Sequence, residues 1–194
     1  MAGIYEIPEG RNIESSSLCY IENDGCYLMM HRVVKENDIN HDKWIGVGGH
    51  FEEGENSDEC LVREVKEETG IIISDYRYRG LITFIPYEGN VELMHLYTAT
   101  LKDADMTQSI IKSLKSGHDA PAGNKSEDDS ASVRMDEGIL EWVPKDEIWD
   151  LELWEGDRIF LKILLEGKAF KEMLLAYDEN DRLCEAMLEG VPLI

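Results

Sequence analysis

The sequence predicts an α+β or α/β/α domain, in which a sheet packs against helices. Strand-like apolar runs and helix-like segments follow one another in mixed order along the chain, which is typical of these classes. The length of 194 residues suits one domain, spanning residues 1–194, that buries a sizeable core. A hydrophobic content of 43% and a charged content of 31% are values of a globular protein.

The first half of the chain predicts a hairpin, a short strand and one well-bounded helix. The hairpin covers residues 18–32 with an Asn-Asp-Gly turn, and the strand covers residues 44–47. Asn56 is suited to cap the helix, because Glu59 follows it in the capping-box position. Gly70 suits the left-handed residue that ends a helix.

The second half predicts more strands, two helices and one insertion. The expected elements are a strand pair over 78–87 and 91–101, a strand over 138–144, helices over 145–151 and 155–167, and a hairpin over 169–188. Residues 103–135 are rich in Ser, Gly, Asp and Lys and show almost no apolar periodicity. We therefore expect them to form a flexible insertion within the domain.

Charge and composition narrow the functional classes. A net charge of −22 argues against binding a nucleic acid polymer, although metal ions at an acidic site would still neutralise the phosphates of a nucleotide. No apolar run is long enough to span a bilayer, and no secretory signal pattern opens the chain. The four cysteines lack C-x-x-C spacing, which favours free thiols over a zinc site. We expect a cytoplasmic monomer or homodimer with no membrane partner.

Three glutamates on the expected helix share one face. Glu64, Glu67 and Glu68 lie three and four positions apart. Like charges at this spacing destabilise a helix by roughly 0.2–0.5 kcal/mol per pair. A bound divalent cation would compensate for the repulsion, and the alternative is an acidic face in contact with solvent. Oxygen ligands on a rigid helix suit hard ions such as Mg²⁺ or Mn²⁺.

The residues around these glutamates match a long motif. Gly49, Glu55 and the run from Arg63 to Ile71 fit every fixed position of G-x5-E-x7-R-E-U-x-E-E-x-G-U, where U is aliphatic. This pattern resembles the Nudix box, and the chain resembles a MutT-like Nudix hydrolase. The resemblance implies the Nudix fold, an α/β/α sandwich with a mixed central sheet and the box as a loop-helix-loop.

The resemblance also implies the metal ligands. Glu64, Glu67 and Glu68 are the implied metal-binding carboxylates, assisted by the backbone carbonyl of Gly48. Bound Mg²⁺ or Mn²⁺ would polarise a phosphoryl oxygen and help to activate water. A role of Glu64 as general base is left open, because the family does not place its base uniformly.

Arg63 and Glu55 are expected to brace the helix against the preceding loop. Because of this bracing, Arg63 is counted with the three glutamates among the expected catalytic residues. Outside the box, Glu137 occupies a position that resembles a distal metal ligand of the nucleotide-sanitising enzymes. Asp136 competes for that role, and the alternative is that Glu137 is an ordinary acid at the start of a strand.

A Trp-x-x-Asp segment before the second expected helix resembles the base-binding segment of enzymes that hydrolyse oxidised purine nucleotides. By this resemblance Trp154 stacks on a purine and Asp157 hydrogen-bonds its edge. The alternative is that Trp154 is a core aromatic residue and Asp157 a helix cap. Phe84 and Met94 are expected as pocket walls, with ordinary core positions as their alternative.

The end of the first hairpin carries two candidates for binding phosphate, His31 and Arg32. Arg32 is favoured because it is always charged and can bind phosphate through two parallel hydrogen bonds. One departure from the resembling enzymes follows Trp44, where some relatives read the oxidised base with Asn. This chain carries Ile45, which puts strict 8-oxoguanine selectivity in doubt.

The favoured function is Mg²⁺-dependent hydrolysis of a nucleoside triphosphate, such as the oxidised purine 8-oxo-dGTP, to the monophosphate and pyrophosphate. One alternative keeps the chemistry but takes a nucleoside diphosphate linked to another group, such as ADP-ribose or a sugar nucleotide. Another is a non-catalytic Nudix-like module that binds a nucleotide, against which the complete set of three glutamates argues.

Overall fold

The computed structural model of the chain describes residues 10–34, 39–101, 132–134 and 138–194. Its helices are α1 (Ser57–Thr69), the short 3-10 helix η2 (Ile148–Asp150) and α3 (Glu155–Leu165). Its strands are β1 (Ile13–Asn23), β2 (Cys26–His31), β3 (Trp44–Ile45), β4 (Val47–His50), β5 (Tyr76–Ile85), β6 (Val91–Thr100), β7 (Ser132–Arg134), β8 (Ile139–Pro144), β9 (Glu172–Tyr177), β10 (Leu183–Leu188) and β11 (Val191–Pro192). Neither α1 nor α3 is long and apolar enough to cross a membrane.

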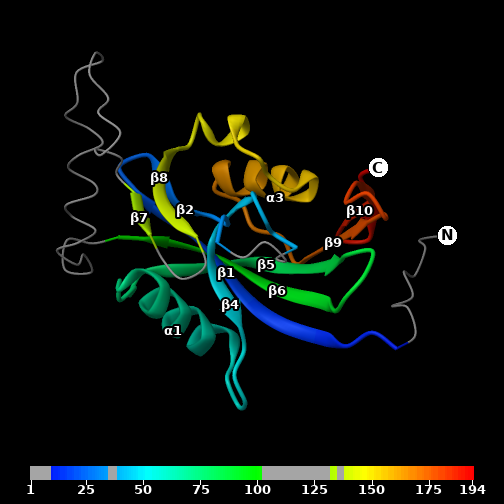
Figure 1. The fold of residues 1–194 in the computed structure, drawn as a ribbon, viewed down its shortest axis with the longest axis horizontal. Helices are drawn as coiled ribbons and strands as arrows, with labels where there is room; N and C mark the ends of the chain where they lie inside the picture. The colour runs from blue at the N-terminus through cyan, green and yellow to red at the C-terminus, as the bar shows by residue number, and fades with distance from the viewer. Residues whose placement is uncertain (1–9, 35–38, 102–131, 135–137) are drawn as a thin grey trace.

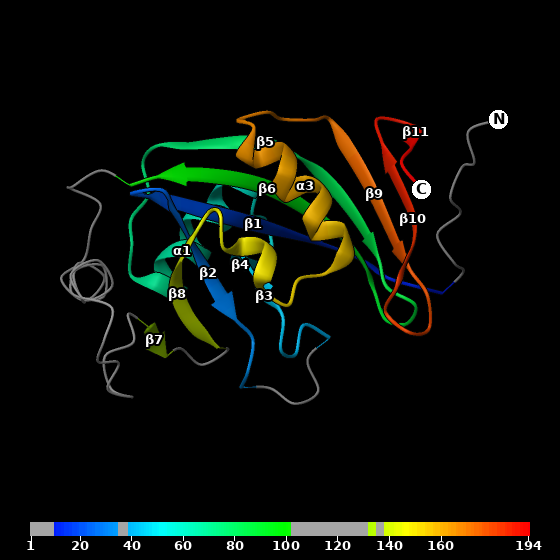
Figure 2. The ribbon, with the colours of Figure 1, turned by 90° about the horizontal axis from the view of Figure 1, so that it is seen from above.

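These strands form one mixed sheet between two helices. The strand order is β11-β10-β9-β5-β6-β1-β2-β8-β7, with β3 beside β2 and β4 beside β1. The pairs β1–β6 and β5–β9 are parallel, and the remaining pairs are antiparallel. Figure 1 shows α1 and α3 on opposite sides of the sheet, and Figure 2 shows α3 lying across the strands. The expected α+β fold with a mixed central sheet is confirmed.

The first hairpin forms where the sequence places it. Asn23 and Cys26 pair across the turn, and the two turn residues Asp24 and Gly25 have φ angles of 46° and 78°. Positive φ at both positions is the geometry of a type I′ turn, which the Asn-Asp-Gly sequence favours. The first strand begins at Ile13, earlier than expected, because its N-terminal half pairs with β6.

The single strand expected over residues 44–47 is two strands instead. β3 pairs with β2, and β4 pairs with β1, so the chain changes partner at Gly46. A Cβ atom at Gly46 would lie 2.7 Å from the carbonyl oxygen of Cys19, so this close passage needs glycine. The change of partner brings Gly48 and Gly49 alongside β1, next to the start of α1.

Each face of the sheet carries its own core. On the face of α3, Phe160 and Leu161 are fully buried against residues such as Tyr20 and Leu96. On the face of α1, Leu61 and Val65 are fully buried, as the expected apolar side of that helix requires. Burying one such side chain stabilises the fold by about 1.5–3 kcal/mol. The two cores fix both helices to the sheet.

Three further elements differ from expectation. Residues 132–134, at the end of the expected insertion, form strand β7 beside β8, whereas residues 103–131 and 135 lie outside the described residues. The expected helix over 145–151 is reduced to one 3-10 turn, η2. After the last hairpin the chain adds the two-residue strand β11, which no pattern indicated.

Candidate active site

The N-terminus of α1 is capped by side chains. The Asn56 side-chain oxygen accepts hydrogen bonds from the amides of Asp58 and Glu59 at 3.0 and 3.1 Å, and Glu59 accepts one from the Asn56 amide at 3.0 Å. Gly70 ends the helix with φ of 73°. The capping box and the glycine ending confirm the boundaries expected from the sequence. The glutamates of α1 therefore sit on a rigid element.

Two glycines of β4 lie directly against these glutamates. The Gly48 amide donates a hydrogen bond of 3.0 Å to the Glu68 carboxylate. A Cβ atom at Gly49 would lie 2.5 Å from the carboxyl carbon of Glu64, and one at Gly48 would collide with the Ser17 carbonyl. Glycine at position 49 thus leaves room for the Glu64 carboxylate beside the strand, and glycine at position 48 lets β4 pass close to β1.

Arg63 connects the acidic side chains to the loop. Its guanidinium donates two hydrogen bonds to Glu55, at 2.6 and 2.8 Å, and one each to Glu64 at 2.7 Å and Glu67 at 3.2 Å. A further bond of 3.0 Å reaches the His50 carbonyl. The hydrogen bonds from Arg63, with one from the Glu52 amide, lower the pKa of Glu55 to about 2. These are the bracing contacts expected of Arg63 and Glu55.

A cavity of about 1340 Å³ joins this acidic cluster to an apolar region across the sheet. Its polar lining includes Gly48, Gly49, Arg63, Glu64, Glu67 and Glu68 from the motif, and residues such as Glu14, Arg32, Asn40, Glu88 and Glu92 from outside it. Its apolar lining includes Leu18, Met30, Ile45, Phe84, Met94 and Trp154. Residues from β1 to α3, distant in sequence, thus surround one continuous space. A site that is charged at one end and aromatic at the other suits a nucleotide.

The donor set fits a divalent cation that shares its coordination with a ligand. Glu64 is largely enclosed, with 15% of its side chain exposed, whereas Glu67 is 61% exposed. Within the described ranges, no three acidic, histidine or cysteine side chains converge to form a complete metal cage. Mg²⁺ usually binds through one or two carboxylates plus substrate phosphates, so such a cage is not needed. Glu137 and Asp136 lie outside the described residues.

Trp154 belongs both to the core and to the cavity wall. Only 4% of it is exposed, and its ring meets those of Phe84 and Tyr177 edge-on at 5.6 and 4.9 Å. Its indole N–H donates a hydrogen bond of 2.8 Å to the side-chain oxygen of Asn40, and the Lys43 ammonium lies 5.5 Å from the ring centre. Trp154 is therefore a core aromatic residue that also lines the cavity, and its stacking on a purine stays a prediction.

Asp157 is a buried carboxyl group in the same cavity. It is 5% exposed, and burial raises its pKa to about 8, against an opposing influence of Lys43. No described side chain donates a hydrogen bond to it. The alternative role as a helix cap is wrong, because α3 begins one residue after Trp154 and has no side-chain capping bond. At neutral pH the group is protonated and can donate a hydrogen bond.

The two phosphate-binding candidates occupy different surroundings. Arg32 lines the cavity. The ring of His31 instead stacks on Trp44, with centroids 4.5 Å apart, and its Nε2 lies 2.9 Å from the Asp42 carboxylate. His31 is not among the residues that line the cavity, whereas Ile45 is. The structure therefore brings Arg32, but not His31, together with the other candidates.

Ser16 is a cavity residue that the sequence did not single out. It is 3% exposed, lines the cavity, and its hydroxyl has no hydrogen-bond partner in the part of the chain that the structure describes. It pairs with Met94 of β6 and with His50 of β4. A ligand would satisfy this hydroxyl. A serine in a run of three serines carries no local signal for such a role.

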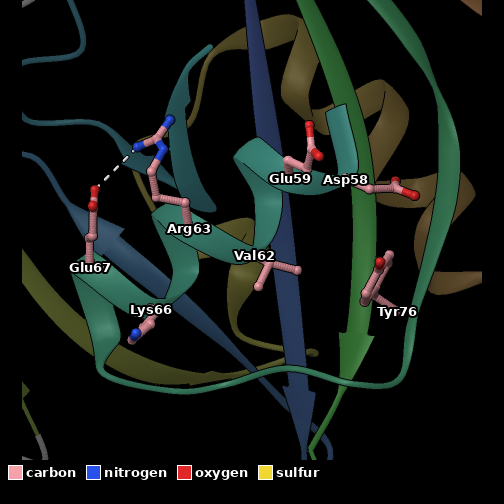
Figure 3. Close-up of a pocket in the computed structure, with 7 residues that line it drawn as sticks. All are labelled: Asp58, Glu59, Val62, Arg63, Lys66, Glu67 and Tyr76. Carbon is pink, nitrogen blue, oxygen red and sulfur yellow. Dashed lines mark hydrogen bonds and ion pairs between the residues drawn. The ribbon is translucent and has the colours of Figure 1, made fainter. Parts of the chain in front are cut away.

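A second pocket, of about 710 Å³, lies on the outer side of α1. Figure 3 shows Arg63 and Glu67, joined by their ion pair, together with Val62 of the same helix and Tyr76 of β5. Glu64 and Glu68 do not line this pocket, and neither does any residue of the aromatic region. The cavity of about 1340 Å³, which contains both the acidic and the aromatic residues, is therefore the candidate active site.

Comparison with known proteins adds independent information. The model of the family described as NUDIX domain matches residues 14–163. An uncharacterised Nudix hydrolase, YvcI, from Bacillus subtilis is 27% identical over 75% of this chain and 79% of its own length. The oxidized purine nucleoside triphosphate hydrolase of Mus musculus is 26% identical over 80% of this chain and 84% of its own. A MutT protein from Bacillus halodurans, at 21% identity, has a similar fold with a TM-score of 0.67, covering 92% of this chain and 99% of its own.

Proposed function

The chain belongs to the Nudix family of hydrolases, and from this premise we propose that it hydrolyses a nucleoside triphosphate to the monophosphate and pyrophosphate. The observation that carries the proposal is the single cavity with box carboxylates at one end and an aromatic, apolar region at the other. The relative from mouse supports the choice of substrate, because its name specifies oxidised purine nucleoside triphosphates. We propose an oxidised purine as the preferred base.

Glu64, Glu67, Glu68 and the Gly48 carbonyl are the proposed ligands of Mg²⁺, with Mn²⁺ as a substitute. When bound, the ion would polarise the phosphoryl oxygens and lower the pKa of a bound water. The chain itself supplies the carboxylates at fixed positions, because Arg63 and the Gly48 amide hold three of them by hydrogen bonds. Glu137 is proposed as a further ligand.

Phosphate and base are bound by different walls. Arg32, which lines the cavity, is proposed to bind a phosphate group through its guanidinium. His31, which does not line it, is the second candidate for this role. Trp154, Phe84 and Met94 are proposed to contact the faces of the base. The protonated carboxyl of Asp157 is proposed to donate a hydrogen bond to an acceptor on the base edge. At the acidic end of the cavity, a water molecule is proposed to attack phosphorus and hydrolyse the phosphoanhydride bond.

One observation favours a second candidate substrate. The cavity volume of about 1340 Å³ exceeds the 300–1,000 Å³ or so that is typical of small-molecule sites. A nucleoside diphosphate linked to a further group, such as ADP-ribose or a sugar nucleotide, would fill more of it. The same box chemistry would then cleave the pyrophosphate bridge.

A substrate panel distinguishes the candidates. The unmodified protein is assayed with Mg²⁺ on 8-oxo-dGTP, dGTP, dCTP, ADP-ribose and a sugar nucleotide, with kcat/KM measured for each and the products identified. The proposal expects the highest value for 8-oxo-dGTP or another purine triphosphate. A higher value for ADP-ribose or the sugar nucleotide would replace the first candidate by the second.

The buried carboxyl of Asp157 should make stability depend on pH. The folded protein keeps this proton up to about pH 8, whereas the unfolded chain, with an ordinary carboxyl pKa of 3.8, releases it near pH 4. The free energy of unfolding should therefore fall between pH 4 and pH 8, by up to about 1.4 kcal/mol per pH unit from this group. Asp157→Asn should gain stability relative to the unmodified protein as pH rises through this window.

Urea denaturation at several pH values measures this difference. Asp150→Asn, which removes an exposed carboxyl from the neighbouring η2, serves as the control and should show no comparable gain. A difference between Asp157→Asn and the unmodified protein that stays constant from pH 4 to pH 8 would show that Asp157 is charged in the folded state.

A further inference from the structure

We propose that Asn40 is a positioning residue that fixes the orientation of the Trp154 ring for base binding, and thereby contributes to substrate selectivity. The inference rests on the proposed function, because it takes Trp154 as a wall of the base pocket. It concerns a residue that lies in the loop between β2 and β3, outside the box and outside the Trp-x-x-Asp segment.

The contact between the two residues has an unambiguous direction. The indole Nε1 of tryptophan only donates, so the Asn40 side chain must present its carbonyl oxygen, 2.8 Å away. Trp154 is 4% exposed, so an indole N–H that lost this acceptor would be left buried without a partner. Because losing this hydrogen bond would cost free energy, the bond holds the ring in the orientation that Asn40 sets.

Asn40 can set an orientation because the stretch from Asn40 to Trp44 is fixed at several points. The Asn40 carbonyl accepts a hydrogen bond from the Lys43 amide at 2.9 Å, and the Lys43 carbonyl accepts one from Arg32 at 2.9 Å. The Lys43 ammonium binds the Glu152 carboxylate at 2.7 Å, and the Trp44 amide donates to the Glu152 carbonyl at 3.0 Å. The stretch from Asn40 to Trp44 is thus joined to the end of β2 and to the residues just before Trp154.

The other contacts of Trp154 within the described residues do not provide a hydrogen-bond acceptor for its indole N–H. Phe84 and Tyr177 meet the ring edge-on through apolar contacts, and the backbone carbonyl of Trp154 accepts the Asp157 amide of the first helical turn at 3.1 Å. These contacts confine the ring but offer no acceptor to its N–H. On the neighbouring wall, Ile45 has no polar side-chain group. The hydrogen bond that fixes the orientation of the ring plane therefore comes from Asn40.

The test combines a spectroscopic and a kinetic measurement on the full chain. Asn40→Ala removes the acceptor, and Asn40→Asp keeps an oxygen at the same distance from the backbone. Indole N–H resonances are followed by ¹⁵N–¹H NMR, with the Trp154 signal assigned through Trp154→Phe. We expect Asn40→Ala to move the Trp154 signal and to raise KM for purine triphosphates about three- to tenfold with little change in kcat, and Asn40→Asp to restore both.

Asn180→Ala is the matched control, because Asn180 is exposed in the β9–β10 turn and does not line the cavity. It should change neither the Trp154 signal nor KM. An unmoved Trp154 signal in Asn40→Ala, or a moved signal with unchanged KM for purine and pyrimidine triphosphates alike, would overturn the inference. Failure of the unmodified protein to hydrolyse any purine triphosphate would instead overturn the proposed function, while the NMR signal still reports the hydrogen bond.

Discussion

Replacing Glu68 with glutamine should lower kcat by at least about a hundredfold while the protein stays folded. Loss of a residue that only supports a metal ligand typically costs about 10–100-fold, so loss of a ligand itself should cost more. Glutamine keeps the size of the side chain and an oxygen that can accept the hydrogen bond from the Gly48 amide. The change therefore removes charge with little change in packing. Glu67→Gln should have an effect in the same direction.

Steady-state kinetics with Mg²⁺, together with the thermal midpoint of each variant, measure this effect. Glu53→Gln is the matched control, because it removes the same charge from an exposed position in the loop before α1 and does not line the cavity. It should retain nearly normal turnover. Nearly normal turnover in Glu67→Gln and Glu68→Gln as well would refute the metal-site assignment.

Arg63→Ala should reduce both activity and stability. Without the guanidinium, Glu55, Glu64 and Glu67 lose the four hydrogen bonds of 2.6 to 3.2 Å that now brace them. The carboxylates would then repel one another and lose their fixed positions. We expect kcat/KM to fall by about 10–100-fold, as for other residues that orient metal ligands. Arg63→Lys should recover little, because an ammonium cannot form the two-pronged contact with Glu55.

The kinetic and thermal measurements on Arg63→Ala need a control for the loss of one positive charge. Arg77→Ala provides it, since Arg77 is exposed on β5 and does not line the cavity. Activity close to that of the unmodified protein in Arg63→Ala would mean that the carboxylates keep their positions without the brace.

Local patterns explain how much of the site the sequence predicted. The cap at Asn56, the glycine at position 70 and the spacing of the glutamates all lie within one short segment, so the helix and its acidic face follow from neighbouring residues. The fixed offsets from Gly49 to Ile71 add the loop that packs against them. The hairpin turn at Asp24 and Gly25 is local in the same sense.

Features that depend on contacts between distant residues could not be predicted from the sequence. The division of one expected strand at Gly46 depends on which strand each half pairs with. The bond between Asn40 and Trp154 joins positions 114 residues apart, and no periodicity indicates it. The protonated state of Asp157 arises from burial by several elements, which a helix-cap pattern at the same position cannot reveal.

The most direct measurement follows the products of 8-oxo-dGTP hydrolysis by ³¹P NMR, first with Mg²⁺ and then after the metal is removed with EDTA. The account predicts 8-oxo-dGMP and pyrophosphate in equal amounts, no reaction after chelation, and recovery when Mg²⁺ is restored. Release of orthophosphate with 8-oxo-dGDP, or hydrolysis that continues at the same rate in EDTA, would contradict it.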